Sequence, residues 1–183
     1  MPNSAQKAPS KTIPSLTKTV AIDAKFVNAF LSSTIHTLKT QCHHDIQPSK
    51  SFILTDPSTI RPDIMGVIAL LSPIFNGSVA LCLKKATSLT LLNRMMNSAY
   101  TDITDEVATG AAKLLDAIFQ GAQTELTHLG IKIEKAVPEV LRGNDIKVPS
   151  LTADGPTIVV PFKTGNDSFQ VLVSLTKSGV SHS

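Results

Sequence analysis

The side chains best suited to chemistry share one polar stripe of an amphipathic segment, residues 104–129. They recur at steps of three and four residues: Thr109, Lys113, Asp116, Gln120 and Gln123. This spacing places side chains on one face of an α-helix. An ammonium and a carboxylate among amides suit polar contact with a partner protein. On a solvent-facing helix they also suit a plain surface ion pair between Lys113 and Asp116, which contributes about 0.2–0.5 kcal/mol.

The segment that carries this polar stripe is predicted to be one unbroken helix. Asp105 and Glu106 lie where a helix start favours negative charge, and His128 lies where a helix end favours a cation. Gly130 follows, and glycine readily adopts the positive φ that closes a helix. The apolar residues form the opposite face: Val107, Ala111, Leu114, Leu115, Ile118, Ala122, Leu126 and Leu129. One face can therefore join a core while the other meets solvent or a partner.

Other candidate motifs predict neither a metal centre nor a second catalytic site. The run CHHD at 42–45 contains metal-binding residue types, but consecutive side chains rarely converge on one ion and no second cluster of matching spacing follows. We interpret this run as the polar exit of a helix. The sequence has no glycine-rich phosphate loop and no G-x-S-x-G motif. Cys42 and Cys82 are too few for a disulfide framework, so we expect both to be reduced.

The composition favours one globular domain that binds neither nucleic acid nor membrane. The chain has 183 residues, of which 42% are hydrophobic and 17% charged. The net charge of +3 comes from the first twenty residues, which hold three lysines and no acid. The remaining neutral body has one Tyr and no Trp, which argues against nucleic-acid binding. Because the sequence has no apolar run of ~18 residues and no apolar leader, we expect a cytoplasmic protein without a membrane span.

Helical and extended patterns alternate along the chain. Helices are predicted at 23–41, 87–99 and 104–129, and strands at 51–55, 65–72, 77–85, 131–137, 157–162 and 168–175. Asp23 is the expected N-cap of the first helix, and Thr87 or Ser88 that of the second. Prolines and glycines predict a long irregular loop at 138–156. Short links between strands favour an antiparallel sheet with helices packed on one face, an α+β fold.

The domain is expected to span residues 21–176, between a flexible N-terminal tail (1–20) and a frayed C-terminus (177–183). Within it, AKFVNAF (24–30) and AKLLDAI (112–118) echo each other and indicate an internal duplication.

Residues 22–176 resemble a CheX-like domain of the CheC/CheX/FliY family of chemotaxis phosphatases. The resemblance rests on the order of elements, on the hairpin IALLSPIFNGSVALCL, and on the helix AAKLLDAIFQGAQTEL with the LGIKIEKAVPEVLRG that follows it. It implies a pseudo-duplicated α+β fold and a homodimer that pairs strands across its interface. It also implies a place in chemotaxis or two-component signalling.

The resemblance further implies a partner and a reaction. The family hydrolyses the aspartyl-phosphate of a CheY-type response regulator, so the partner would be a receiver domain. That domain supplies its own magnesium, and we expect no cofactor on this chain. The family motif is Glu-x-x-Asn on the exposed face of the long helix. The Glu would pair with the receiver's active-site lysine, and the Asn amide would orient the attacking water.

In this sequence the motif positions are altered. Lys113 occupies the Glu position and Asp116 the Asn position, while Lys25 and Asn28 occupy the matching positions of the first helix. Lys113 would repel the receiver's lysine. Asp116 would place a second negative charge beside an acyl phosphate, at a cost of ~1–4 kcal/mol at contact. We therefore expect a non-catalytic module that binds a response regulator through the polar stripe.

Two alternatives stay open. One is a divergent phosphatase, in which Lys113 and Asp116 are degenerate catalytic residues. The other is a ligand-binding or scaffold domain that keeps only the fold.

Overall fold

The computed structural model describes residues 15–135, 137–148 and 156–177. Within them the helices are α1 (Ser15–Gln41), α2 (Lys85–Met96) and α3 (Asp105–His128), with a 3-10 turn, η1, at Pro57–Thr59. The strands are β1 (Gln47–Pro48), β2 (Phe52–Ile53), β3 (Ile64–Leu71), β4 (Phe75–Leu83), β5 (Glu134–Lys135), β6 (Glu139–Arg142), β7 (Thr157–Thr164) and β8 (Asp167–Lys177). This element order confirms the alternation of helical and extended segments that the sequence predicts.

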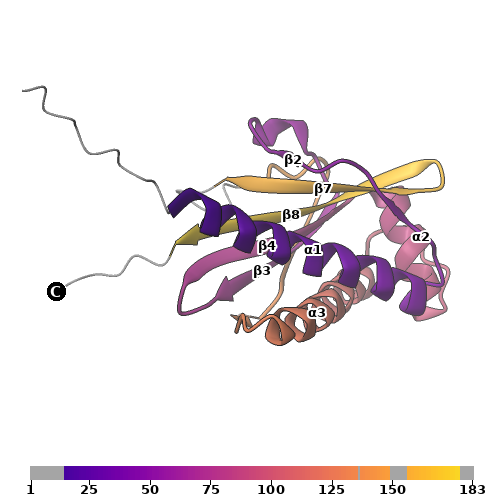
Figure 1. Cartoon of the computed structure of the whole chain (residues 1–183). Helices are drawn as coiled ribbons and strands as arrows, with labels where there is room; N and C mark the ends of the chain where they lie inside the picture. Colours follow the sequence, from indigo (N-terminus) through magenta and orange to yellow (C-terminus); the bar gives the residue numbers. More distant parts are fainter. Residues whose placement is uncertain (1–14, 136, 149–155, 178–183) are drawn as a thin grey trace, which may run out of the picture.

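The strands form one antiparallel sheet. Its order is β1-β7-β8-β4-β3-β5, with β2 paired to β7 and β6 paired to β3. Helices α1 and α3 lie across the same side of this sheet (Figure 1). The predicted α+β class, with an antiparallel sheet and helices on one face, is confirmed.

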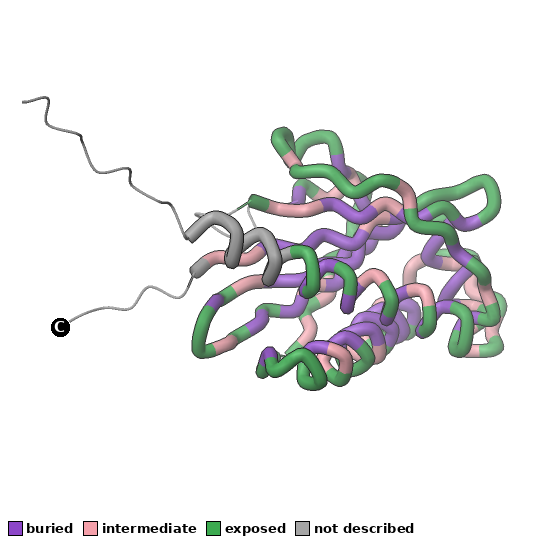
Figure 2. The backbone as a smooth tube through the Cα atoms, in the orientation of Figure 1, coloured by how far each residue is buried: buried purple, intermediate pink, exposed green. Residues whose placement is uncertain are grey.

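The main core lies between the sheet and the helices. Phe26 and Phe30 of α1 are fully buried, and the ring of Phe26 meets that of Phe75 edge-on at 5.3 Å between centroids. The predicted apolar face of α3 is also buried, except at its last position (Figure 2). Leu129 is 46% exposed because it is the C-cap residue, where the chain leaves the helix. Its predicted place in the core is therefore wrong.

A smaller core covers the other face of the sheet. Alternate strand residues such as Met65, Cys82 and Leu172 point away from the helices. They pack against Ile60, which follows η1, and against Val148. Loop segments, rather than helices, shield this face.

The topology has the symmetry expected of a duplicated unit. In the first half, α1 is followed by the short strands β1 and β2 and then by the β3–β4 hairpin. In the second half, α3 is followed by β5 and β6 and then by the β7–β8 hairpin. The short strands are exchanged: β1 and β2 pair with β7, whereas β5 and β6 pair with β3. The two hairpins meet along β4 and β8.

The helices α1 and α3 pack closely at one point. The hydroxyl of Ser33 on α1 donates to the carbonyl of Ile118 on α3 at 2.6 Å. A Cβ added at Gly121 would overlap the Ser33 hydroxyl and would lie 3.2 Å from the Ser33 Cβ. Glycine therefore permits the approach of the two helices that carry the echoed sequences.

Several predicted boundaries are wrong. Helix α1 begins at Ser15, so the Asp23 cap is not used and residues 15–20 of the predicted tail are helical. The rest of the predicted tail and residues 178–183 lie outside the described part of the chain. The predicted loop at 138–156 contains β6, and the predicted strand at 131–137 is reduced to β5.

The predicted caps of α2 are also wrong. The helix begins at Lys85, before Thr87 and Ser88, and the Ser88 hydroxyl donates back to the Lys85 carbonyl at 2.8 Å. The N-terminal capping acceptor is instead Asp63, whose Oδ2 accepts from the Lys85 backbone N–H at 2.9 Å. A cap supplied by a residue that precedes another strand leaves no local sequence signal.

Candidate partner-binding site

Helix α3 is unbroken and capped at both ends. The hydroxyl of Thr104 accepts from the Val107 N–H at 3.4 Å, and Asp105 and Glu106 occupy the first turn, as predicted. At the other end Gly130 has φ +77°, and the N–H of Ile131 bonds to the carbonyl of Leu126 at 2.9 Å. Because the opposite, apolar face of the helix is buried, the polar stripe faces outward.

The centre of the polar stripe forms the floor of a shallow groove of about 530 Å³. Its lining comes from the end of α1, the middle of α3 and the segment after β5: Gln41, Ala112, Lys113, Asp116, Ala117, Gln120 and Pro138. Three of the five predicted site residues therefore share one concave surface. Small alanines in its floor leave room for side chains from another molecule.

Asp116 is engaged by groups from two directions. Its Oδ2 accepts from the Gln120 side-chain amide at 2.8 Å, and its Oδ1 contacts the ammonium of Lys135 on β5. Oδ1 has no access to solvent, and the Asp116 side chain as a whole is 30% exposed. The Lys135 ammonium also lies 5.2 Å from the centre of the Phe119 ring. The carboxylate is thus held within the fold.

Lys113 does not make the surface ion pair that its spacing to Asp116 allows. Its side chain is exposed, and no hydrogen bond or ion pair joins it to any residue in the described part of the chain. Because Asp116 is turned toward Lys135, the groove presents the Lys113 ammonium to solvent.

The ends of the polar stripe bond within the chain. The Thr109 hydroxyl is exposed and donates to the Asp105 carbonyl at 2.9 Å. Gln123 is half-buried, and its side-chain amide donates to the Ile133 carbonyl at 2.8 Å. Gln123 therefore stabilises the segment that follows α3. The polar pattern of the sequence alone does not reveal this role. Neither residue lines the groove.

Lys135 is a further member of this site, which the polar stripe of α3 does not reveal. Extended alternation places Lys135 on the same side as Ile131 and Ile133, which are 9% and 4% exposed. A lysine on the buried side of a strand needs a partner for its charge. That pattern was a usable signal, but the identity of the partner depends on how β5 packs against α3.

The matching positions on α1 are open to solvent. Lys25 and Asn28 are both exposed, one helical turn apart. Unlike Asp116, Asn28 has no cation from a neighbouring strand and no hydrogen bond within the described residues. The duplicated unit therefore presents two different polar surfaces.

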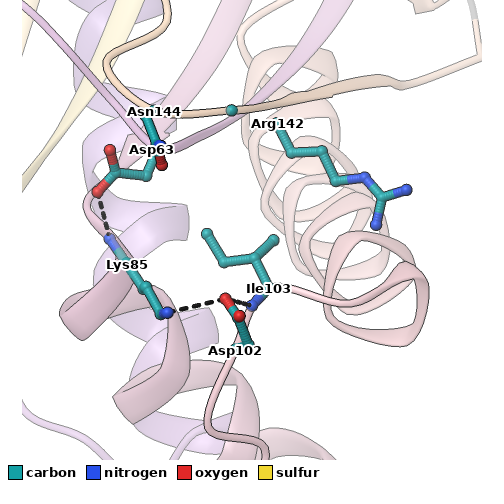
Figure 3. A pocket seen from close by; sticks show the side chains of 7 residues that line it. Asp63, Lys85, Asp102, Ile103, Arg142 and Asn144 are labelled. Atoms are coloured by element: carbon teal, nitrogen blue, oxygen red, sulfur yellow. Dashed lines mark hydrogen bonds and ion pairs between the residues drawn. The ribbon is translucent and has the colours of Figure 1, made fainter.

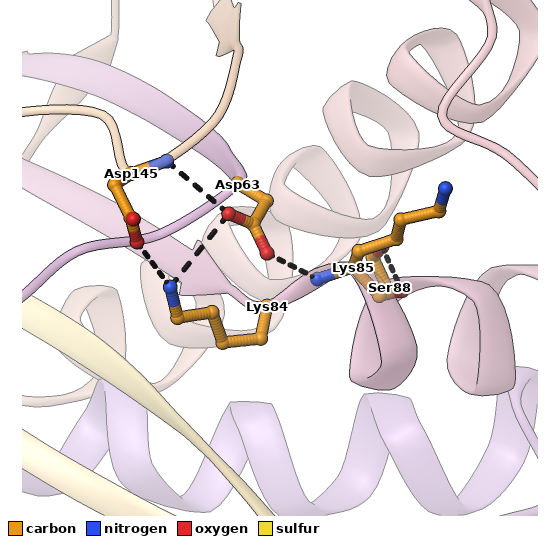
Figure 4. A network of polar contacts seen from close by, with 5 residues as sticks. All are labelled: Asp63, Lys84, Lys85, Ser88 and Asp145. Atoms are coloured by element: carbon orange, nitrogen blue, oxygen red, sulfur yellow. Dashed lines mark hydrogen bonds and ion pairs between the residues drawn. The ribbon is translucent and has the colours of Figure 1, made fainter.

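A second charged cluster surrounds the start of α2 and lines a pocket of about 400 Å³ (Figure 3). Lys84 pairs with Asp145 at 2.6 Å and faces Asp63 at 3.6 Å (Figure 4). Lys85 reaches to Asp102 at 2.8 Å. Each acid here has a cation or a backbone N–H as partner. The cluster therefore joins the start of α2 to the loop after β6.

These contacts shift the titration of Asp63. Partial burial would raise the pKa of Asp63, but hydrogen bonds from the backbone N–H groups of Lys85 and Asp145, with the Lys84 ammonium nearby, hold it below its usual value.

The run 42–45 forms a helix exit, as predicted. His43 has φ 47°, and the His44 N–H bonds to the Leu38 carbonyl at 3.2 Å. The His44 ring lies between Arg94, 3.0 Å from its Nδ1, and the Thr164 hydroxyl at its Nε2. Cys42 is buried as a free thiol. Among the residues that the structure describes, no three His, Cys, Asp or Glu side chains are grouped to hold a metal ion.

In the described parts of the chain, no helix combines the length and the apolar character needed to cross a bilayer.

Known structures with the same fold come from bacterial chemotaxis proteins. A chemotactic CheC-like protein from Shewanella oneidensis is 25% identical, with a TM-score of 0.77 over 84% of this chain and 99% of that one. The chemotaxis protein CheX from Vibrio vulnificus is 23% identical, with a TM-score of 0.78 over 83% and 99%. CheX in a complex with CheY, BeF3 and Mg²⁺ from Borrelia burgdorferi is 17% identical, with a TM-score of 0.68 over 82% and 97%.

No curated protein sequence is significantly similar to this chain. The family model for the chemotaxis phosphatase CheX matches residues 64–163, which is more than half of the chain and includes all of α3. Because this match covers more than half of the chain, the protein belongs to the CheX family of chemotaxis phosphatases.

Proposed function

We propose that this chain is a non-catalytic module of chemotaxis or two-component signalling that binds the receiver domain of a response regulator through the polar stripe of α3. The observation that carries the proposal is the state of Asp116, whose carboxylate is held by Lys135 and Gln120 beside an open groove. The CheX–CheY complex from Borrelia burgdorferi supports a receiver domain as the class of partner.

The chemistry at these positions disfavours hydrolysis. Attack on an aspartyl-phosphate needs a water molecule held in line with the phosphorus. The amide of an asparagine can hold that water without adding charge, whereas Asp116 adds a carboxylate next to the phosphoryl oxygens. Two unit charges of the same sign in contact repel by about 1–4 kcal/mol, depending on the dielectric, and the Lys135 ammonium beside Asp116 reduces this repulsion. Asp116 is also already bonded to Gln120, so it is not free to direct a water molecule.

Receiver domains encoded in the same genome provide the test. Each is loaded with beryllofluoride and titrated against this chain by calorimetry, and each is separately phosphorylated and followed for loss of phosphate. We expect binding by at least one receiver and no acceleration of its dephosphorylation. Acceleration that disappears in Asp116→Ala would instead support the divergent phosphatase. Binding by no receiver would leave the ligand-binding or scaffold role.

A double variant tests whether only the motif was lost. Lys113→Glu with Asp116→Asn restores the residue types that the CheX resemblance predicts for an active phosphatase. We expect it to accelerate dephosphorylation of the receiver that the native chain binds, measured with enough of the variant to offset the weaker binding that the loss of Lys113 would cause. Each single variant serves as a control, since either alone leaves one unfavourable charge in place.

We also propose that the chain forms a homodimer. Strand β6 supports this, because within the described residues it pairs with β3 alone, which leaves its other edge open. Val137, just before β6, and Leu141 within it are 84% and 43% exposed. Sedimentation velocity should show a dimer, and Leu141→Lys should shift it toward the monomer. Sedimentation of the native chain as a monomer would refute this proposal.

A further inference from the structure

The groove on α3 is electrostatically asymmetric. Two charged side chains line it, Lys113 and Asp116, but only one of them is uncompensated. Asp116 contacts the Lys135 ammonium through Oδ1 and accepts from Gln120 through Oδ2. Lys113 is exposed and has no ion pair within the described residues. Counted together with Lys135, which pairs with Asp116, the groove therefore has two ammonium groups against one carboxylate, and the uncompensated charge that faces into it is that of Lys113.

The position of Lys135 is what produces this asymmetry. The Lys135 side chain is 29% exposed and its ammonium lies between the Asp116 carboxylate and the Phe119 ring. Pairing at a partly desolvated site is less screened than pairing in open water. Lys135 thus neutralises Asp116 from behind, on the side of the sheet, and does not itself line the groove.

The hydrogen-bond donors of the groove indicate what kind of anion it accepts. The backbone N–H groups in the middle of α3 are used within the helix, so the groove offers no cluster of main-chain donors for a phosphate. Its lining offers one uncompensated ammonium, Lys113, and the side-chain amides of Gln41 and Gln120. One free cation in a lining that also has amides suits a carboxylate, which carries a single charge and two acceptor oxygens.

From these observations we infer that Lys113 is a specificity-determining residue, which anchors an acidic side chain of the receiver-domain partner in the α3 groove. Lys135 is a positioning residue that keeps Asp116 from repelling that side chain. The inference rests on the proposed function, because it takes the receiver domain as the occupant. It adds the chemistry of the contact: a glutamate or aspartate of the partner faces Lys113.

The test uses the full chain and the receiver domain that binds it in the calorimetric screen. Lys113→Met should weaken binding about tenfold at low salt, and Lys113→Glu should weaken it further, because a contact charge at an interface is lost or reversed. The difference between the native chain and Lys113→Met should shrink at high salt. Lys163→Met is the matched control, since Lys163 is an exposed lysine on β7 that does not line the groove, and this variant should bind like the native chain.

A second pair of variants tests the role of Lys135. Lys135→Met leaves the Asp116 carboxylate without its cation, so binding should weaken although Lys135 does not line the groove. Adding Asp116→Asn to Lys135→Met should restore binding to within about twofold of the native chain, because no charge then remains at that position. Circular dichroism of each variant identifies any loss of the fold, and Asp116→Asn alone should bind at least as tightly as the native chain.

The outcomes separate this inference from the proposed function. Binding that is unchanged in Lys113→Met, or tighter in Lys113→Glu, would overturn the inference and leave receiver binding intact. Failure of Asp116→Asn to restore binding in a folded Lys135→Met chain would overturn the role of Lys135. Absence of binding by any receiver would remove the proposed function and the inference together.

Discussion

Asp63 shows how one carboxylate can join three segments of this fold. It accepts backbone N–H groups from Lys85 and Asp145 and faces the ammonium of Lys84. Its pKa is lowered, so the charged form stabilises the folded state above the usual carboxyl pKa, and this contribution is lost as the pH falls through the folded value.

We expect Asp63→Asn to lower the free energy of unfolding by about 1 kcal/mol near neutral pH, because the charge at the start of α2 is lost. The difference from the native chain should diminish in acid, where Asp63 itself becomes protonated. Urea denaturation at neutral and acidic pH measures both effects. Asp45→Asn is the control, because Asp45 is 87% exposed and lies 3.6 Å from Lys39 in a surface pair, so its loss should change little.

The two thiols support a second prediction at the scale of the residue. Burial raises the pKa of Cys42 to about 11, despite the opposing charge of Arg94, and raises the pKa of Cys82 to about 12. Since the thiolate is the reactive form, both should react slowly with a disulfide reagent at mildly alkaline pH while the chain is folded. In denaturant both should react with the reagent as fast as the thiol of an unstructured peptide. Fast reaction of either in the folded chain would contradict the buried placement.

The residues of the site divide according to what determines them. The polar stripe was predictable because it depends only on the helical period, and Lys113 is exposed as that period requires. The pairing of Asp116 was not predictable, because its partner Lys135 arrives from a strand whose position depends on the whole sheet. Gln123 was predicted to bind a partner, but its side-chain amide donates to the Ile133 carbonyl. This bond was not predictable either, because it depends on where the chain after α3 lies.

At the scale of the element, the contact between α1 and α3 depends on a glycine, Gly121, at the point where the helices meet. Gly121→Ala should destabilise the protein by about 1–3 kcal/mol, because the new methyl group meets the Ser33 hydroxyl. Combining it with Ser33→Ala removes the overlapping atom. The double variant should therefore lose less stability than the two single variants lose in sum. Gly143→Ala is the control, since the nearest side-chain atom lies 3.9 Å from the added Cβ. Thermal unfolding of the native chain, the two single variants and the double variant completes the double-mutant cycle.

The long elements were predictable, whereas the short strands β1 and β6 were missed and β2 and β5 were predicted too long. Helix α3 and strands β4 and β8 have periodic apolar patterns that specify them locally. Strands β1, β2 and β5 are two residues long, and none of their residues is buried. They exist because β3 and β7 offer open edges, which is a property of the tertiary structure. Strand β6 lay inside a Pro- and Gly-containing region for which the local signal favoured a loop.

At the scale of the whole molecule, the exchange of short strands makes each half depend on the other. The first half supplies β1 and β2 to β7, and the second half supplies β5 and β6 to β3. The hairpins share the β4–β8 seam, and α1 packs on α3 through Ser33. A half alone would leave an open strand edge and an exposed apolar face, and so would lack enough burial to offset its conformational entropy.

We therefore expect the fragments 15–100 and 101–177 to lack native structure separately and to regain it when mixed. The cut lies between α2 and α3, outside every helix and strand. Circular dichroism should show a sheet signal and a cooperative thermal transition only in the equimolar mixture. Gly121→Ala in the second fragment should weaken this association, because Gly121 lies against α1, whereas Gly143→Ala should not. A cooperative transition in either fragment alone would show instead that the halves are independent units, and the exchanged strands would then be accessory to folding.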